Sequence, residues 1–181
     1  MTIIKEFSEV ENYADKLKEI KVWVCSNACG KTFLCQNDDR FFDLDTYRGR
    51  MKNKISFRDE LSINKMYEMI EAGKVILNAP HEYFLRYLDE NKIPFVLTYG
   101  KLEVEEEYLE RMIKRGSDEE FIRTHGHLVS TLYYERSIDE RPAIKIEMGK
   151  GEFLTDYIVK IFGTPRNYEE NKGLQLKLLS D

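Results

Sequence analysis

The residues best suited to chemistry lie in one short stretch near the N-terminus, Cys-Ser-Asn-Ala-Cys-Gly-Lys-Thr at 25–32. An apolar run at 20–24 precedes it and is typical of a buried strand. The order of strand, small-residue loop and Gly-Lys-Thr follows the phosphate-binding motif G-x-x-x-x-G-K-[ST], except that Cys25 stands where the first glycine belongs. This departure matters only if position 25 needs a positive φ, which cysteine tolerates poorly. The stretch predicts a binding site for phosphate groups.

The parts of this loop have distinct expected roles. Its backbone N–H groups and the N-terminus of the following helix would form a concave anion site. Lys31 would reach the β- and γ-phosphates of a nucleotide and Thr32 would offer its hydroxyl to Mg²⁺, so ATP and Mg²⁺ are the expected cofactors. The alternative is a Gly-Lys-Thr that occurs by chance at a strand-to-helix turn. The residues expected to bind the nucleotide are Ser26, Asn27, Ala28, Cys29, Gly30, Lys31 and Thr32.

An acidic pair follows the next apolar run. A strand is predicted over 41–45, and the period of two would place Asp43 and Asp45 on one side of it. Because ligands of open α/β sheets bind beyond the carboxyl ends of the strands, Asp43 is expected to act in catalysis and to hold Mg²⁺ together with Thr32. Asp45 and Arg48, which opens a basic cluster, are expected to bind the acceptor. The alternative is a turn in which Asp45 caps a helix.

Two arginines lie at a predicted bend between helices. A charged helix is expected over 103–115, ending at Gly116, and a second helix from Ser117 to about residue 135. Arg111 and Arg115 are four residues apart, on one helical face. Arginines on such a mobile lid can close over a transferring phosphoryl group, which makes both candidates for catalysis. The alternative is ion pairing of Arg111 with Glu107.

The strand predicted at 74–78 ends in Asn78, where related sites carry a carboxylate. The metal would then rely on Asp43, or the metal site would be weak. His81 follows this strand end and could approach the cleft, but a surface position at the start of a helix is the favoured interpretation.

The order of the elements predicts the fold class. Strands are expected near 20–25, 41–45, 74–78, 94–99 and 143–147, with helices between them. This alternation predicts an α/β fold with a five-stranded parallel sheet in a three-layer arrangement. Without repeats or a recognisable linker, residues 1–181 are expected to form one domain, with the helical lid at about 103–135. The alternating residues at 174–178 in the tail predict a late strand.

Composition narrows the classes of function. A net charge of −5 does not favour a broad nucleic-acid surface. No run is long enough to span a membrane and the N-terminus lacks the pattern of a signal peptide, so a cytoplasmic protein is expected. Three cysteines, an odd number, argue against a disulfide framework.

Over most of its length the chain resembles the nucleoside-monophosphate kinase group of P-loop proteins. Phe42-Asp43-Leu44-Asp45 is similar to the D-x-D of shikimate kinases, which implies Asp43 near Mg²⁺ and Asp45 near the acceptor. The segment from Arg111 to Arg123, with Arg-Gly-Ser-Asp-Glu-Glu at 115–120, is similar to the lid of guanylate kinases. Arg115 matches an arginine of that lid motif, whereas Arg123 does not match the next one. The substrate motif of guanylate kinases is absent, so GMP is not implied. The altered loop and Asn78 also suit divergent kinases encoded by phages.

The sequence therefore predicts an ATP-dependent kinase that uses a nucleotide donor and a small-molecule acceptor, expected to be a nucleoside or deoxynucleoside monophosphate. Two alternatives stay open. One is a nucleotide-binding module without transfer, favoured by Cys25 and Asn78. The other is a kinase for a different hydroxyl acceptor, with Asp45 as the base. The sequence does not fix the oligomeric state.

Overall fold

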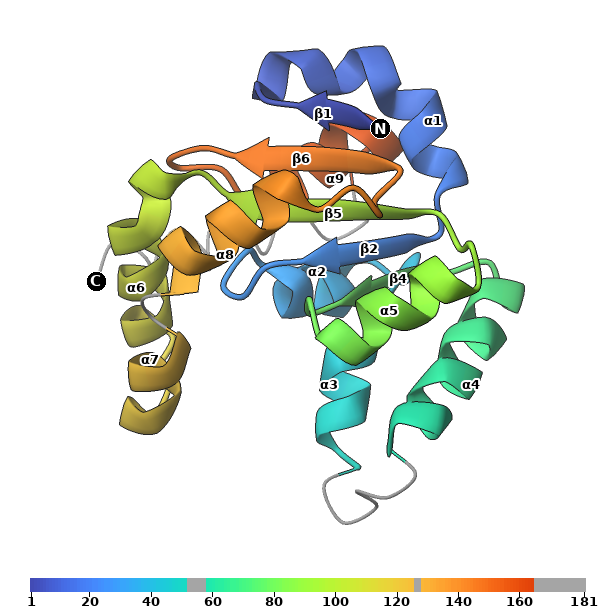
Figure 1. Cartoon of the computed structure of the whole chain (residues 1–181), viewed down its shortest axis with the longest axis horizontal. Coiled ribbons are helices and arrows are strands. Elements are labelled where there is room, and N and C mark those ends of the chain that lie inside the picture. The colour runs from blue at the N-terminus through green and yellow to red at the C-terminus, as the bar shows by residue number, and fades with distance from the viewer. Residues whose placement is uncertain (52–57, 126–127, 165–181) are drawn as a thin grey trace.

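The computed structural model describes residues 1–51, 58–125 and 128–164. Its centre is an all-parallel sheet of six strands in the order β1-β6-β5-β2-β4-β3 (Figure 1). Strand β2, which precedes the predicted phosphate loop, lies between β4 and β5, so this loop follows the carboxyl end of a central strand. The strands are β1 Thr2–Ile4, β2 Val22–Cys25, β3 Phe41–Asp43, β4 Val75–Asn78, β5 Phe95–Gly100 and β6 Ile144–Met148.

The sheet differs from the predicted one in two places. The prediction of five strands was wrong, because Thr2–Ile4 adds a sixth at the edge, paired with β6. Three residues are too few for a periodic signal, and only Ile4 of β1 is buried. The prediction that the strand at 41–45 carries both acids was also wrong. The strand ends at Asp43, which caps the next helix, and Asp45 lies in the first turn of that helix.

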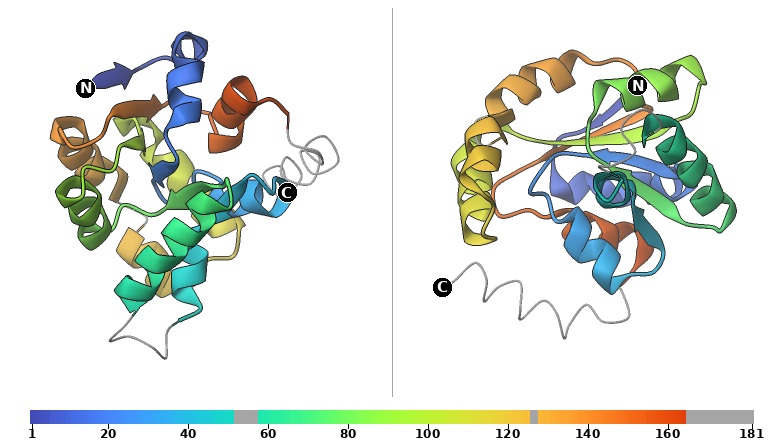
Figure 2. Two further views of the ribbon diagram at one scale, coloured as in Figure 1. Left: turned by 90° about the vertical axis from the view of Figure 1, so that its right-hand side faces the viewer. Right: turned by 90° about the horizontal axis from the view of Figure 1, so that it is seen from below.

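Helices flank both faces of the sheet (Figure 2), an arrangement compatible with three layers. Trp23 points into one core, whereas its neighbours Val22 and Val24 point into the other. The first core is covered by the 3₁₀ helix η1 Phe7–Tyr13, α1 Ala14–Glu19, α2 Lys31–Asn37 and α9 Leu154–Phe162. The second is covered by α3 Leu44–Gly49, α4 Arg58–Glu71, α5 Glu82–Glu90 and α8 Leu128–Ile138.

The region predicted to form a lid begins after β5 with the 3₁₀ helix η3 Leu102–Val104 and α6 Glu105–Lys114. Gly116, with φ 74°, follows the end of α6 where the sequence predicted a stop. The single helix predicted after it is instead two helices, α7 Glu119–His125 and α8. Figure 1 shows α6 and α7 beyond the carboxyl end of β5, while α8 crosses back over the sheet.

The late strand predicted at 174–178 lies outside the described residues. Within the described ranges, no helix is both long enough and apolar enough to cross a membrane.

Candidate functional site

The predicted phosphate loop joins β2 to α2 as a tight turn. Gly30 has φ 101° and directly precedes α2, while Ala28 has φ 59°. Among the described residues other than glycine, only Ala28 and Lys92 have positive φ. Cys25 is therefore not in the region that requires glycine, and the departure from the motif at that position causes no backbone strain. The glycine that the turn needs is Gly30.

Lys31 begins α2 and is almost fully buried. Its Nζ donates hydrogen bonds of 3.0 Å to the carbonyl oxygens of Cys25 and Ser26. Burial would lower the pKa of Lys31, but the nearby Cys29 and Cys25 thiols raise it above its ordinary value. The ammonium is therefore charged at neutral pH and lies directly beneath the loop.

Arg111, on α6, is the second buried cation of this region, with a side chain only 5% exposed. Its Nη2 pairs with Glu107, which confirms the ion pair that the sequence offered as the alternative, and donates to the Glu152 carbonyl oxygen at 3.1 Å. The guanidinium lies over the ring of Phe153, 3.9 Å from its centroid. Its Nε and Nη1 atoms are buried without a hydrogen-bond partner among the described residues. Buried polar groups normally have hydrogen-bond partners, so Nε and Nη1 are two unused donors on a side chain that lines the cavity described next.

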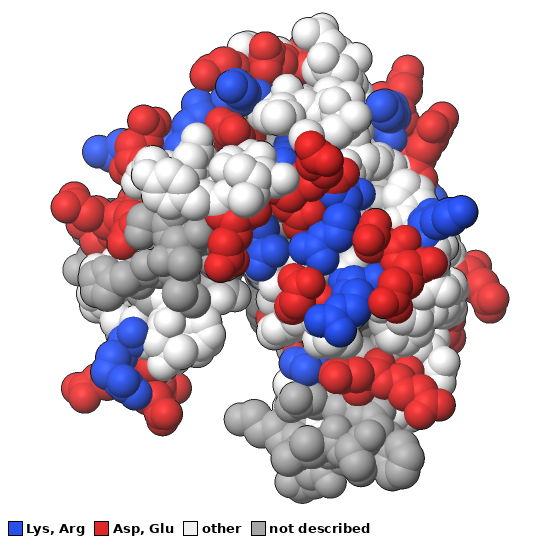
Figure 3. Space-filling model, viewed as in Figure 1, with Lys and Arg blue, Asp and Glu red and all other residues white. Residues whose placement is uncertain are grey.

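The loop and Arg111 line one cavity of about 400 Å³ between α3 and the α6–α7 pair. Figure 3 shows, in the orientation of Figure 1, a notch between the surface over α7 and the surface over α3. Four cations, two carboxylates and three phenylalanines line this cavity, a mixture suited to a ligand that has both phosphates and an apolar part. Its lining is Asn27, Ala28, Gly30, Lys31, Thr32, Phe33, Asp43, Asp45, Arg111, Lys114, Arg115, Phe121 and Phe153.

Thr32 and Asp43 contact each other at the floor of the cavity. Thr32 Oγ1 donates to Asp43 Oδ2 at 3.1 Å, and Asp43 also accepts from the backbone N–H and the hydroxyl of Thr46. Within the described ranges no cluster of three or more His, Cys, Asp or Glu side chains could hold a metal ion. Mg²⁺ keeps several waters and usually takes one or two carboxylates plus phosphates, so a hydroxyl beside a carboxylate fits an ion that arrives with a nucleotide.

Asp45 lines the same cavity and is paired with His81. Its Oδ1 lies 3.0 Å from His81 Nε2. Burial raises the pKa of Asp45, but the hydrogen bond with His81 and the charge of Lys31 bring it below its ordinary value. Asp45 is therefore an ionised carboxylate next to the phosphate loop.

Three of the predicted site residues, Ser26, Cys29 and Arg48, do not line the cavity. Ser26 donates from Oγ to the Thr98 carbonyl oxygen at 3.1 Å, and Cys29 is fully buried in the core. A hydrogen bond with Cys25 lowers the pKa of Cys29 although burial opposes it, and the charge of Lys31 adds to the effect. Neither residue lines the cavity, so the loop can use only their backbone atoms.

Arg48 also lies outside the lining. It forms a salt bridge of 3.0 Å with Asp59, and its guanidinium lies 4.7 Å from the ring centroid of Tyr83. Arg115, in contrast, reaches the cavity as predicted. Its guanidinium lies 5.1 Å from the ring centroid of Phe121, and its Nε donates to Ser117 Oγ at 2.7 Å.

Sequence reasoning did not predict four residues that line the cavity, Phe33, Lys114, Phe121 and Phe153, or the contact of His81 with Asp45. His81 does lie at a helix start, as predicted, but its ring also contacts Asp45. The signal in the sequence was the position of His81 after a predicted strand end, where ligands of such sheets bind. Lys114 and Phe121 flank the predicted bend, whereas Phe153 carries no motif and reaches the cavity only through the packing of the loop before α9.

In comparisons with known proteins, no family model matches this chain and no curated protein matches it in sequence.

Proposed function

We propose that the chain is a phosphotransferase that takes a phosphoryl group from a nucleotide, expected to be ATP, and gives it to a small acceptor. The observation that carries this proposal is the pair of unpartnered guanidinium nitrogens on buried Arg111, in the cavity that Lys31 also lines. Glu107 balances the charge of Arg111, but the two buried donors still lack acceptors, which is costly for a buried polar group. Phosphate oxygens would supply them, and the adjacent phosphate-loop motif selects phosphate among anions.

The residues of the cavity have distinct roles in this proposal. Lys31 and the loop N–H groups bind the donor phosphates, and Thr32 and Asp43 hold Mg²⁺. The ion, when bound, neutralises charge that develops on the phosphate oxygens. Arg111 and Arg115 stabilise the transferring group from the lid side. Phe153 and Phe121 supply apolar surface for the rest of the nucleotide.

The proposed acceptor is a nucleoside or deoxynucleoside monophosphate, with Arg48 and Asp45 on the acceptor side. The contact between Asp45 and His81 favours a second candidate, a neutral hydroxyl acceptor. An ionised carboxylate beside the phosphate loop can accept the proton of a hydroxyl as the phosphoryl group arrives. A monophosphate needs no such base, but it does need a cation, and Arg48 is engaged with Asp59.

A transfer assay tests the function. Labelled ATP with Mg²⁺ would be offered with a panel of nucleoside monophosphates and, separately, of sugar and nucleoside hydroxyl compounds. We expect transfer to a member of one class, and an Arg115→Gln variant should turn over at least tenfold more slowly. Arg123→Gln is the matched control, because Arg123 is exposed on α7 and does not line the cavity.

The outcomes separate the three interpretations. Transfer to monophosphates alone supports the kinase of the nucleotide type, and transfer to hydroxyl compounds alone supports Asp45 as the base. ATP binding without transfer to any acceptor would overturn the transferase and leave the binding module. An Arg115→Gln variant as active as the parent would remove the lid arginine from the mechanism.

A further inference from the structure

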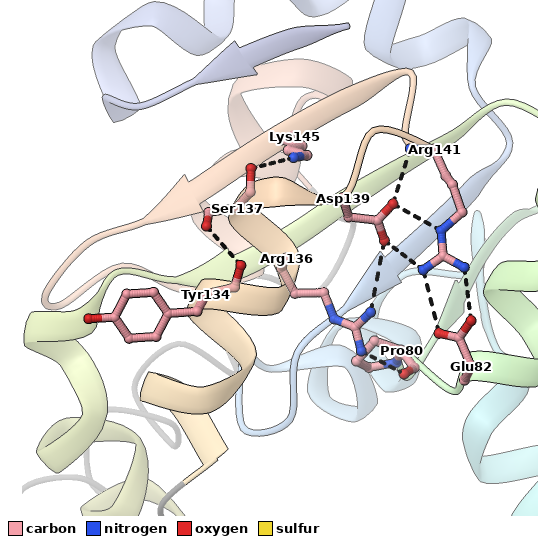
Figure 4. Close-up of polar contacts among 8 residues, drawn as sticks. All are labelled: Pro80, Glu82, Tyr134, Arg136, Ser137, Asp139, Arg141 and Lys145. Atoms are coloured by element: carbon pink, nitrogen blue, oxygen red, sulfur yellow. Dashed lines mark hydrogen bonds and ion pairs between the residues drawn. The ribbon is translucent and has the colours of Figure 1, made fainter.

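A cluster of charged side chains outside the cavity lies where α8 ends and β6 begins (Figure 4). Its centre is Asp139, whose side chain is 5% exposed. Asp139 accepts hydrogen bonds from Arg141 Nε and Nη2 at 2.9 and 2.8 Å, and its Oδ2 lies 3.9 Å from Arg136 Nη1. Burial raises the pKa of Asp139, but the bonds from Arg141 lower it below its ordinary value. One ionised carboxylate therefore fixes two guanidinium groups.

These two guanidinium groups contact the residues on either side of His81. Arg136 Nη2 donates to the carbonyl oxygen of Pro80 at 3.2 Å. Arg141 donates from both terminal nitrogens to the carboxylate of Glu82, at 3.0 and 3.4 Å. His81, which precedes the first residue of α5, is therefore bracketed by two contacts that both originate at Asp139.

The cluster is itself fixed to the sheet. Lys145 of β6 is fully buried, and its Nζ donates to the Ser137 carbonyl oxygen near the end of α8 at 2.8 Å (Figure 4). Ser137 lies between Arg136 and Asp139, so the end of α8 is held against β6 at this point. The contacts around His81 thus start from a segment that is hydrogen-bonded to the central sheet.

We propose that Arg136, Asp139 and Arg141 are positioning residues that hold His81 against Asp45, and that this clamp sets the orientation of the acceptor-side carboxylate. The chain of contacts runs from Asp139 through Arg136 and Arg141 to Pro80 and Glu82. From there it continues through His81 to Asp45, which lines the cavity. The catalytic part of this inference rests on the proposed function, whereas the positioning of His81 does not.

Two variants weaken the clamp at different points. Asp139→Asn removes the central charge, and Glu82→Gln removes the charge at the outer end. Glu82 has a side chain 60% exposed, so Glu82→Gln should fold even if Asp139→Asn does not. Glu90→Gln is the matched control, the same change at an exposed position at the other end of α5. Glu82→Asp keeps the charge and should restore part of the parent behaviour.

The first measurement is the NMR signal of the His81 ring nitrogens, which report its hydrogen bond with Asp45. The chain has three histidines, so the signal is assigned with His81→Gln. We expect Glu82→Gln and Asp139→Asn to shift this signal and Glu90→Gln to leave it in place. The second measurement is kinetic: kcat for transfer should fall at least threefold in the two clamp variants, while KM for the nucleotide stays unchanged.

An unshifted His81 signal in folded Glu82→Gln would overturn the clamp, whatever the activity. A shifted signal with unchanged kcat would overturn its role in transfer and keep the positioning. If the parent protein transfers no phosphate at all, the proposed function fails, and the His81 signal still decides whether the clamp exists.

Discussion

The two sides of the cavity use their charges differently. On the donor side, formed by Lys31, Arg111 and Arg115, the buried Arg111 keeps two guanidinium nitrogens without partners among the described residues. On the proposed acceptor side, Asp45 lines the cavity and is paired with His81, while Arg48 lies outside the lining and is paired with Asp59. The proposed donor side therefore keeps unused hydrogen-bond donors on Arg111, whereas the charged side chains of Asp45 and Arg48 are already paired within the protein.

The largest expected effect is on the donor side. Lys31→Met keeps the length of the side chain but removes the charge beneath the phosphate loop. We expect phosphoryl transfer to fall by about 10²–10³, the range found when one electrostatic stabiliser of a transition state is removed. Steady-state transfer assays measure it, with the exposed Lys16→Met as the control for the same change. A Lys31→Met enzyme at the parent rate would contradict the donor-side assignment.

The clamp next to the acceptor side should have a pH signature. The folded-state pKa of Asp139 is depressed, so its contribution to stability is present above the unfolded pKa of about 3.9 and is lost as the pH falls through the folded value. We expect Asp139→Asn to lower the free energy of unfolding by about 2 kcal/mol at pH 7. Denaturant titrations should show this difference shrinking below about pH 4. A difference that stays constant to low pH would show that the charge of Asp139 is not its source.

Arg48 separates the two acceptor classes. If a monophosphate binds on the acceptor side, Arg48 must break its salt bridge with Asp59 and form a new one with the acceptor phosphate. We then expect Arg48→Gln to raise the acceptor KM about tenfold without changing the affinity for ATP, since an exchanged charge-assisted hydrogen bond is worth about 1.5 kcal/mol. Initial-rate kinetics with varied acceptor measure this. An unchanged KM would exclude Arg48 from acceptor binding and favour the hydroxyl acceptor.

The smallest effects concern the backbone of the donor loop. Gly30 has φ 101°, which L-residues rarely adopt, and an added Cβ would meet only Phe153 Cδ1 at an ordinary 3.9 Å. Gly30→Ala should therefore destabilise the fold through the backbone, by about 1–2 kcal/mol.

Cys25→Gly, which restores the motif, should give no gain in ATP affinity, because Cys25 has no positive φ. Thermal unfolding measures the stability of Gly30→Ala, and ATP titration measures the affinity of Cys25→Gly. A large gain in ATP affinity in Cys25→Gly would show that Cys25 distorts the loop.

The sequence predicted the parts of the fold that have strong periodicity or a motif. The buried strands at Val22–Cys25 and Val75–Asn78 and the loop at 25–32 follow from apolar runs and a defined turn chemistry. The edge strand Thr2–Ile4 was missed because its pairing with β6 is a long-range contact between short segments. Asp43 was correctly predicted as a strand residue, but its carboxylate also caps the next helix, a role that the sequence offered only as an alternative for Asp45.

The site shows the same limit. Lys31, Thr32 and Arg111 belong to local patterns and line one cavity, whereas Phe153 and the clamp around Asp139 come together only through packing between distant segments. His81 is an intermediate case. Its place after a strand end was visible, but the contact with Asp45 depends on how α3 and α5 lie beside each other. Local chemistry can thus be predicted from one sequence, while partners that are far apart in the chain cannot.

The most direct test of the central claim is calorimetric titration of the protein with ATP and Mg²⁺, in the parent and in Arg111→Met. We predict that the parent binds one nucleotide and that Arg111→Met binds it at least tenfold more weakly, since the unpartnered guanidinium donors are the proposed phosphate ligands. Arg86→Met, the same change at an exposed position on α5, should bind as the parent does. No binding by the parent, or equal binding by Arg111→Met, would contradict the assignment of this cavity as a nucleotide phosphate site.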